Sequence, residues 1–377
     1  MLGNTKKRIL ITGANGFIGK NLLAHISRID LFRVLLYSRE STESDLKDYI
    51  QRSDLIVHLA GENRPIDITS FEISNVQLTQ KICDYASQNQ NKIPIIFSSS
   101  VQVQNKNPYG VSKSAAEDII KKYSEKNKVP VISFRFPGIF GKWAKPNYNS
   151  VVATFCFNIA NCLPIELVDK EKKLTLCYID DIIELIIQAI YSIDKYTGYS
   201  EINVPGQYLV TLSQLLEKIY AFSDSKKNLQ LSHVGSGFDR ALYATYTSYL
   251  PKYKFSYGLK IKTDERGSFT EVLKTIDSGQ ISFLRINPGH SRGKHFHHTK
   301  IEKFIVVSGV SKFRFRNTLI DEVYEIEIDG SSMAMVVETI PGWAHEIINI
   351  GTQDLVVLVW SNEIFDPNKP DTIASVV

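Results

Sequence analysis

Hydrophobic residues in the first 167 positions recur as short uninterrupted runs separated by longer segments of helical character. A short apolar run bounded by turn residues is typical of a strand buried on both faces, and its alternation with helices predicts a parallel sheet covered by helices. The predicted strands are centred on residues 9–11, 34–36, 55–57, 95–97 and 131–134.

Two further regions follow this alternating part. Residues 167 to about 256 are mostly helical in pattern, with helices expected after Asp180-Asp181 and after Thr211-Leu212-Ser213. Beyond Tyr257 the period changes to two, and Gly and Asp turns separate the runs, which predicts an all-β barrel or sandwich. We therefore expect an α/β Rossmann-type domain over residues 1–255 and a β-barrel domain over residues 256–377.

Composition fits this two-domain organisation and narrows the choice of partners. A chain of 377 residues exceeds a typical single domain, and its net charge of +4 comes from scattered basic residues, so no nucleic-acid partner is expected. Neither a signal peptide nor an apolar run of membrane-spanning length is present, so no membrane insertion is expected. Four cysteines without a C-x-x-C pair favour buried free thiols and a cytoplasmic location: Cys83, Cys156, Cys162 and Cys177.

A glycine-rich loop follows the first predicted strand and opens a helix. Small residues let the backbone approach a pyrophosphate, and the free N–H groups of a helix N-terminus favour the anion. Glycines alone are weak evidence for a dinucleotide site, so the assignment depends on the motifs that follow. The residues expected to contact the cofactor here are Gly13, Asn15, Gly16, Phe17, Ile18 and Gly19.

A run of serines at the end of a strand precedes a tyrosine and a lysine on a helix. Ser98-Ser99-Ser100 ends an apolar strand, and Tyr109 and Lys113 then share one face of a helix. An ammonium four residues from a phenol can lower the phenol pKa from about 10 toward neutrality, so Tyr109 could exchange a proton with a substrate oxygen.

Taken with the glycine loop, these motifs make residues 8 to about 250 resemble the extended short-chain dehydrogenase/reductase family, in its nucleotide-sugar-modifying branch. The resemblance implies that Tyr109 is the general acid and that Lys113 positions the nicotinamide ribose and tunes Tyr109. It also implies that Ser100 hydrogen-bonds the reacting carbonyl, with Ser99 as the alternative if the strand register shifts by one.

The end of the second predicted strand bears on the choice of nicotinamide cofactor. An NAD enzyme usually places a carboxylate there, whereas this chain has Ser38 and Arg39, which favour the 2′-phosphate of NADPH; Glu40 would favour NAD after a one-residue shift. The family resemblance also implies that Asp54 meets the adenine amine and that Leu59 and Ala60 meet the dinucleotide backbone. Asn75 resembles the helix asparagine of the family, with an exposed helix residue as the alternative.

The β region carries a metal-site spacing. His295 and His297 lie two apart and project to one face of a strand, His298 points to the other face, and Glu302 follows five residues after His297. With His345, the set offers three imidazoles and one carboxylate. Such a set suits zinc first, with iron, nickel or manganese as alternatives.

The two motifs that hold these ligands resemble those of the cupin superfamily. Gly342, His345 and Asn349 fit the second motif, although its proline is displaced by one position to Pro341. The segments 264–271 and 288–295 resemble the opening of deoxysugar 3,5-epimerases, cupins that remove a proton beside a 4-keto group. His295 stands where metal-free epimerases carry the base, so the base is unassigned if His295 binds metal.

From end to end the chain resembles the bifunctional nucleotide-sugar enzymes of capsular polysaccharide synthesis. This resemblance implies a zinc-bearing cupin that epimerises C3 of a UDP-4-keto-2-acetamido-2,6-dideoxy-L-hexose. It implies NADPH-dependent C4 reduction to UDP-2-acetamido-2,6-dideoxy-L-talose, toward UDP-N-acetyl-L-fucosamine for capsule or O-antigen, by a homodimer. Lys142, Lys145 and Asn149 could bind the UDP-sugar, although solvation explains them equally well. The alternatives are a reductase with the cupin as a dimerisation module and, more distantly, a non-catalytic sensor.

Overall fold

A computed structural model describes residues 6–167, 169–204, 208–332 and 334–377. The chain divides into two compact units, Met1–Ile219 with Ala241–Leu250 and Tyr220–Arg240 with Pro251–Val377. The chain passes into the second unit for the last time between Leu250 and Pro251, close to the boundary predicted at residue 255. The fold class predicted from the sequence is confirmed, with a Rossmann-type parallel sheet in the first unit and antiparallel strands consistent with a cupin-type β domain in the second.

The main sheet of the first unit has six parallel strands in the order β2-β1-β3-β4-β5-β8. Five of its strands coincide with the predicted apolar runs. Four of these runs are buried, whereas the run of the edge strand β2 is only partly buried, with Leu36 exposed. The sixth was not predicted, because its sequence Tyr-Ser-Glu-Ile-Asn is largely polar. The strands are β1 (Lys7–Thr12), β2 (Phe32–Tyr37), β3 (Leu55–His58), β4 (Ile95–Ser100), β5 (Val131–Phe136) and β8 (Tyr199–Asn203).

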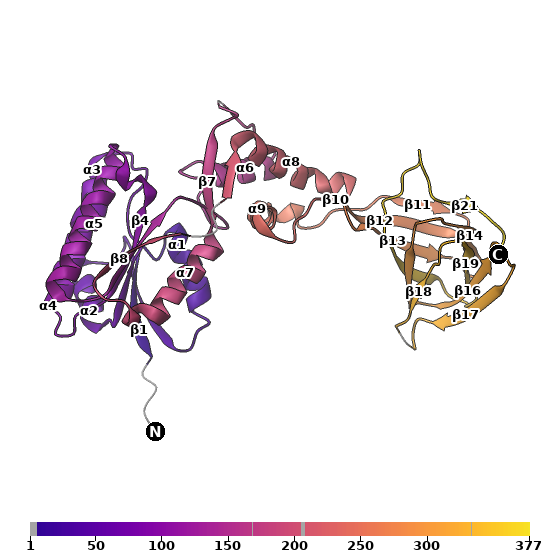
Figure 1. The fold of residues 1–377 in the computed structure, drawn as a ribbon, viewed down its shortest axis with the longest axis horizontal. Helices are drawn as coiled ribbons and strands as arrows, with labels where there is room; N and C mark the ends of the chain where they lie inside the picture. The colour runs from indigo at the N-terminus through magenta and orange to yellow at the C-terminus, as the bar shows by residue number, and fades with distance from the viewer. Residues whose placement is uncertain (1–5, 168, 205–207, 333) are drawn as a thin grey trace, which may run out of the picture. The chain divides into compact units, whose positions relative to one another are not determined.

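Helices cover both faces of this sheet (Figure 1). Helices α2, α4 and α5 pack together on one face, and α1 packs with α7 on the other. Apolar residues of α2, α4 and α5 form one continuous buried core with those of the strands. The helices are α1 (Phe17–Ile26), α2 (Glu43–Arg52), α3 (Thr69–Phe71), π-helix η1 (Glu72–Gln77), α4 (Leu78–Gln88), 3-10 helix η2 (Val101–Gln104), α5 (Pro108–Asn127), α6 (Val151–Ala160), α7 (Ile179–Ser192), η3 (Ile193–Lys195), α8 (Leu212–Asn228), α9 (Gly237–Ser248) and η4 (Lys252–Lys254).

A smaller three-stranded sheet, in the order β6-β7-β9, completes the first unit. It consists of β6 (Gly138–Phe140), β7 (Lys173–Tyr178) and β9 (Tyr208–Thr211). The region predicted as mostly helical therefore contains several strands besides the two expected helices, α7 and α8. No helix of the described residues is long and apolar enough to cross a membrane. Three cysteines are buried as expected, but Cys162 is exposed.

The second unit contains two sheets whose strands are antiparallel except for the β10–β12 pair. One sheet has the order β10-β12-β13-β20-β15-β18 with β11 beside β12, and the other has the order β17-β16-β19-β14-β21. Alternate apolar side chains from both sheets form one core, as the period of two predicted. The strands are β10 (Gln230–Leu231), β11 (Ile261–Asp264), β12 (Gly267–Thr275), β13 (Gly279–Ile286), β14 (Ser291–Phe296), β15 (Glu302–Ser308), β16 (Val310–Asn317), β17 (Val323–Asp329), β18 (Val336–Glu338), β19 (Trp343–Asn349), β20 (Leu355–Ser361) and β21 (Ile373–Ala374).

Candidate functional site

The glycine loop lies at the carboxyl edge of the parallel sheet, between β1 and α1. Gly13 has a φ of +71°, and a Cβ there would lie 2.7 Å from the backbone nitrogen of Ala60. A Cβ on Gly19 would lie 2.3 Å from the Gly13 carbonyl oxygen, so both positions exclude side chains. Gly16 precedes α1 without a side-chain cap, which leaves the first N–H groups of the helix available. The loop therefore fits a dinucleotide pyrophosphate.

The predicted contact residues of this loop are all on the same edge. Asn15 is exposed in the loop, and Phe17 and Ile18 begin the first turn of α1. Leu59 and Ala60 follow β3 and hydrogen-bond to the backbone oxygen and the hydroxyl of Thr12. These contacts place the end of β3 directly beside the loop.

The assignment of Asp54 to the adenine is wrong. This residue precedes β3, and its backbone nitrogen bonds to the carbonyl of Arg8 near the start of β1. It therefore lies at the amino edge of the parallel sheet, opposite the glycine loop. Its carboxylate accepts hydrogen bonds from the Arg8 guanidinium at 2.8 and 3.2 Å, which lower its pKa. Asp54 has a structural role there.

Arg39 and Ser38 lie at the carboxyl end of β2, where the sequence predicted them. The Ser38 hydroxyl accepts a hydrogen bond from the Glu40 nitrogen at 3.3 Å. Arg39 is exposed, and its guanidinium pairs with the carboxylate of Glu62, which also accepts a hydrogen bond from the Tyr148 hydroxyl. Sequence reasoning missed Glu62, since nothing in its local pattern indicates a partner 23 residues away.

The three predicted catalytic residues meet where β4 ends and α5 begins. The Ser100 hydroxyl is close enough to Tyr109 to act on the pKa of its phenol. Ser99 lies on the opposite side of the strand, toward Glu117, whose pKa, despite burial, is lowered chiefly by the Arg135 guanidinium. Lys113 is buried and donates a hydrogen bond to the Ser98 carbonyl at 2.6 Å. The strand register therefore places Ser100, and not Ser99, at the tyrosine.

The electrostatics of this triad differ from the expectation. Burial raises the pKa of Tyr109, and the neighbouring Ser100 hydroxyl opposes that rise only in part. Burial lowers the pKa of Lys113 to about 8. The phenol is therefore protonated at neutral pH, which suits a group that donates a proton, and the predicted lowering of its pKa by Lys113 is not found here.

A buried hydrogen-bond relay connects the glycine loop to the catalytic helix. The Thr12 hydroxyl lies 2.7 Å from His58 Nδ1, and His58 Nε2 lies 2.9 Å from the Thr79 hydroxyl, which donates to the Asn75 carbonyl at 2.6 Å. Because Thr79 uses its proton on that carbonyl, His58 must donate through Nε2 and accept through Nδ1. The amide of Asn75 then donates to the Ser112 hydroxyl at 2.9 Å, next to Lys113.

Asn75 is almost fully buried, so the alternative of an exposed helix residue is wrong. It stands in the π-helix η1, a helix form that often marks functional sites. Its side-chain oxygen accepts a hydrogen bond from the Glu62 nitrogen at 2.7 Å, and its amide also donates to the Glu62 carbonyl at 2.9 Å. Asn75 therefore holds the chain that follows β3 against α5.

We expect the stability of the first unit to fall in mild acid because of His58. Burial lowers the pKa of His58 to about 3, against 6.5 in an unfolded chain. Between these values the unfolded state binds the extra proton, so the contribution is complete above pH 6.5 and is lost progressively as the pH falls toward 3. His58→Gln should flatten this pH dependence. Urea unfolding at pH 7.5 and 5.0, followed by circular dichroism, measures both slopes, and equal slopes would contradict the assignment.

The predicted metal ligands converge between the two sheets of the second unit. His295 lies on β14 opposite His345 on β19, His297 follows β14, and Glu302 begins β15 in the other sheet. The four candidate ligand atoms lie within 4.8 Å of one another. A β-bulge beside Gly293, which has a φ of +108°, redirects β14 immediately before His295.

The chemistry of this cluster fits a divalent cation. The Nε2 atoms of all three histidines are buried and have no hydrogen-bond partner among the described residues. Glu302 Oε2 lies 3.5 and 3.6 Å from the His297 and His345 Nε2 atoms, beyond normal hydrogen-bond length. Burial and the neighbouring histidines lower the pKa of His295 to about 4, so its imidazole is neutral and able to bind a metal.

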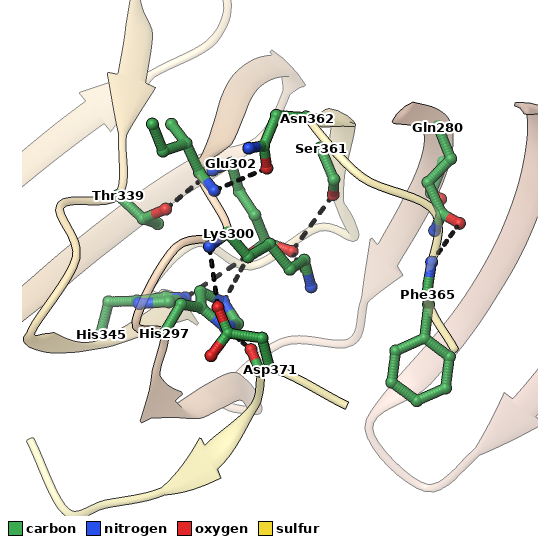
Figure 2. Close-up of polar contacts among 12 residues, drawn as sticks. Gln280, His297, Lys300, Glu302, Thr339, His345, Ser361, Asn362, Phe365 and Asp371 are labelled. Atoms are coloured by element: carbon green, nitrogen blue, oxygen red, sulfur yellow. Dashed lines mark hydrogen bonds and ion pairs between the residues drawn. The ribbon is translucent and has the colours of Figure 1, made fainter. Parts of the chain in front are cut away.

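Other polar groups hold Glu302 in place (Figure 2). Its second oxygen, Oε1, pairs with Lys300 Nζ at 2.8 Å and accepts a hydrogen bond from the Ser361 hydroxyl at 3.3 Å. Its backbone nitrogen donates to the Thr339 hydroxyl at 2.9 Å. Despite the cost of burial, the nearby histidines and Lys300 keep the pKa of Glu302 well below its usual value. The sequence motif gave no indication of these three supports.

The loop after β6 shows how its predicted sugar-binding residues lie. Lys142 pairs with Asp180 at the start of α7, so its ammonium already has a protein partner. Lys145 and Asn149 are exposed, and Lys145 lies over the Tyr148 ring at 5.3 Å from its centroid. In the second motif, Asn349 donates to the Ile286 and Gln353 carbonyls at 2.8 Å and therefore supports the fold.

Comparison with known proteins accounts for nearly the whole chain. Residues 9–204 match the model of the NAD dependent epimerase/dehydratase family, which is more than half of the 377 residues. The chain belongs to the NAD dependent epimerase/dehydratase family. Residues 262–373 of this family member match the polysaccharide biosynthesis C-terminal domain.

Two relatives of this epimerase/dehydratase family member extend over both units. A UDP-2-acetamido-2,6-beta-L-arabino-hexul-4-ose reductase of Pseudomonas aeruginosa is 45% identical over 97% of this chain and 98% of its own. The capsular polysaccharide assembling protein CapF of Staphylococcus aureus is 41% identical, with a TM-score of 0.90 over 98% of this chain and all of that one. A UDP-glucuronic acid 4-epimerase of Bacillus cereus bound to NAD shares only the fold, at 19% identity and a TM-score of 0.55 over 64% of this chain and 98% of its own.

Proposed function

We propose that the chain is a UDP-sugar 4-ketone reductase of surface-polysaccharide synthesis whose second unit epimerises C3 of the same sugar. The reductase part is supported by the 45% identical reductase and by the convergence of Ser100, Tyr109 and Lys113 beside the glycine loop. We propose that the specific substrate is a UDP-4-keto-2-acetamido-2,6-dideoxy-L-hexose. The product would be UDP-2-acetamido-2,6-dideoxy-L-talose, toward UDP-N-acetyl-L-fucosamine for capsule or O-antigen. Residues 1–255 would carry the reduction and residues 256–377 the epimerisation.

The first unit supplies positioning and a proton for the reduction. NADPH, held by the glycine loop and by Arg39, would supply the hydride to C4. Ser100 would hold the sugar carbonyl through its hydroxyl, and Tyr109, whose raised pKa keeps the phenol protonated, would donate the proton to the resulting oxygen. Lys113, whose ammonium is fixed by the Ser98 carbonyl, would position the nicotinamide ribose and assist proton donation by Tyr109.

The second unit would hold a divalent metal ion, with zinc as our first choice. His295, His297, His345 and Glu302 supply three neutral imidazoles and one carboxylate. When bound there, such an ion polarises a carbonyl and acidifies the neighbouring C–H, which is the chemistry that C3 epimerisation needs. Lys300 and Ser361 would keep the Glu302 carboxylate directed at that position. We propose a homodimer as the working form.

Exchange at C3 tests the two-activity proposal most directly. NMR of the UDP-4-keto sugar in deuterated water should show deuterium at C3 before NADPH is added and reduction at C4 afterwards. Reduction without deuterium at C3 would favour the second candidate, a reductase in which the β domain only supports the dimer. Absence of both reactions would contradict the enzyme assignment.

We expect Arg39→Ala to weaken NADPH binding by about 10- to 100-fold with little change for NADH. An arginine–phosphate pair contributes ~1.5–3 kcal/mol, and only NADPH carries the 2′-phosphate. Glu62→Gln should have the opposite sign, because it frees Arg39 from a competing carboxylate. Fluorescence titration of each cofactor measures this, with Arg52→Ala as an exposed control on α2. An unchanged NADPH/NADH ratio in the Arg39 variant would argue for NAD and for Glu40.

A further inference from the structure

The C-terminal segment before β21 contributes a residue to the metal cluster that neither motif contains. We infer that Asp371 is a positioning residue of the metal site, which fixes two of the four ligands through separate contacts. This inference rests on the proposed metal site of the second unit. Figure 2 shows Asp371 beside His297 and Lys300, with Glu302 beyond them.

The first contact sets the tautomer of His297. Nδ1 of this imidazole hydrogen-bonds to the backbone oxygen of Asp371. A carbonyl oxygen only accepts, so Nδ1 carries the proton and Nε2 presents its lone pair toward Glu302 and His345. Outer contacts of this kind orient a metal-binding histidine and fix which nitrogen binds.

The second contact holds the turn that follows His297. Asp371 Oδ1 accepts from the His298 nitrogen at 2.9 Å, and Oδ2 accepts from the Thr299 and Lys300 nitrogens at 2.7 and 2.8 Å. Oδ2 also accepts from the Thr299 hydroxyl at 3.0 Å. One carboxylate thus binds three successive backbone N–H groups, an arrangement that requires the anionic form, and these bonds lower its pKa.

That turn carries the lysine that holds Glu302. The Lys300 nitrogen is bound by Asp371, while its ammonium pairs with Glu302 Oε1 at 2.8 Å and leaves Oε2 directed at the histidines. Only 11% of the Lys300 side chain is exposed, so the pair is well shielded from solvent. Asp371 therefore acts on His297 through its backbone oxygen and on Glu302 through Lys300.

Strand pairing adds to the same arrangement. β21 pairs with β14, so that Ala374 lies opposite His295, and the Ser375 nitrogen donates to the Lys294 carbonyl at 2.9 Å. Release of the Asp371 carboxylate should loosen this short pairing as well, because β21 has only two residues. The effect should therefore be concentrated at the metal ligands of β14 and its following turn.

Asp371→Ala tests the inference on the full-length chain, and Asp366→Ala is the matched control. Asp366 accepts a hydrogen bond from the Asn368 nitrogen within its own turn, 2.9 Å away, and among the residues that the structure describes it makes no hydrogen bond to residues 297–302. Competition titration with a chromophoric chelator should show Zn²⁺ affinity about 10- to 100-fold weaker for Asp371→Ala and unchanged for the control. Asp371→Asn, which keeps one carbonyl acceptor, should fall between them.

Two spectroscopic readouts separate positioning from general loss of structure. The visible spectrum of the Co²⁺-loaded chain should change in Asp371→Ala and not in Asp366→Ala. ¹⁵N NMR of the metal-free chain should show the Nδ1–H tautomer for His297. Asp371→Ala keeps the backbone oxygen that accepts this proton, but loss of the carboxylate should release the segment that carries this oxygen, so a mixture of tautomers is expected in that chain. Wild-type affinity and an unchanged Co²⁺ spectrum in Asp371→Ala would overturn the inference.

The design also distinguishes this inference from the proposed metal site itself. If the wild-type chain binds neither Zn²⁺ nor Co²⁺, the metal site is wrong, and the tautomer of His297 then decides the role of Asp371 alone. A preserved Nδ1–H tautomer in the Asp371→Ala chain would overturn that role, and its loss would support it.

Discussion

Tyr109→Phe is expected to lower NADPH-dependent C4 reduction by about 10²- to 10⁴-fold, the usual contribution of a positioned proton donor. The substitution removes the phenol hydroxyl beside Ser100, and it leaves the ring in its packing against Phe71. Cofactor oxidation at 340 nm measures the loss. C3 exchange should continue at the wild-type rate, because the proposed epimerisation belongs to the other unit.

Tyr123→Phe is the matched control for this experiment. Tyr123 lies on the same helix, and its buried hydroxyl donates to the Ile93 carbonyl at 2.7 Å, far along α5 from the reacting end. Its loss should lower stability by about 1–3 kcal/mol and leave kcat near the wild-type value. Normal reduction by the Tyr109→Phe chain would sink the catalytic assignment.

His295→Ala is expected to abolish C3 exchange and to weaken Zn²⁺ binding by more than the ~10–100-fold typical of outer contacts. The substitution removes one of the three imidazoles and leaves His297, His345 and Glu302 as the remaining candidate ligands. The measurements are metal content by mass spectrometry and deuterium incorporation at C3. NADPH binding to the first unit should be unaffected, which separates this result from global unfolding.

His298→Ala controls for the removal of a neighbouring imidazole. His298 is exposed and points away from the cluster, and its backbone nitrogen, which binds Asp371, is retained in the variant. Metal content and exchange should stay at wild-type levels. Full exchange at C3 by a metal-free His295→Ala chain would show that C3 epimerisation does not need the metal.

The hydrophobic pattern predicted most of the sheet but not its last strand. Wholly apolar runs such as residues 9–11 and 95–97 are buried on both faces only inside a sheet that helices cover, so the pattern predicted β1 to β5. β8 is an edge strand with an exposed glutamate, Glu201, at its centre, and its pairing with β5 is decided by tertiary contacts. The error at Asp54 has a similar origin, since a residue before a parallel strand lies at the edge opposite the strand's carboxyl end.

Site residues were predictable where one short motif contains them. His295 and His297 follow from strand alternation, and Tyr109 and Lys113 follow from helix geometry. Asp371 meets His297 across 74 residues, and His58 meets Thr12 across 46, so no local period carries either contact. These contacts can be recognised only from the three-dimensional structure, where the hydrogen-bond donors and acceptors face each other.

The π-helical turn at Asn75 makes this part of the chain sensitive to length as well as to composition. A π-turn holds one residue more than the α-helical turn that it replaces. Deleting Val76 would let α-helical winding continue from α4, and Asn75 would then take the place of Val76, about 100° round the helix axis. The Asn75 amide would then leave Glu62 and Ser112, although every polar side chain of the network would still be present. A single-codon deletion here should therefore be more damaging than most substitutions in the same helix.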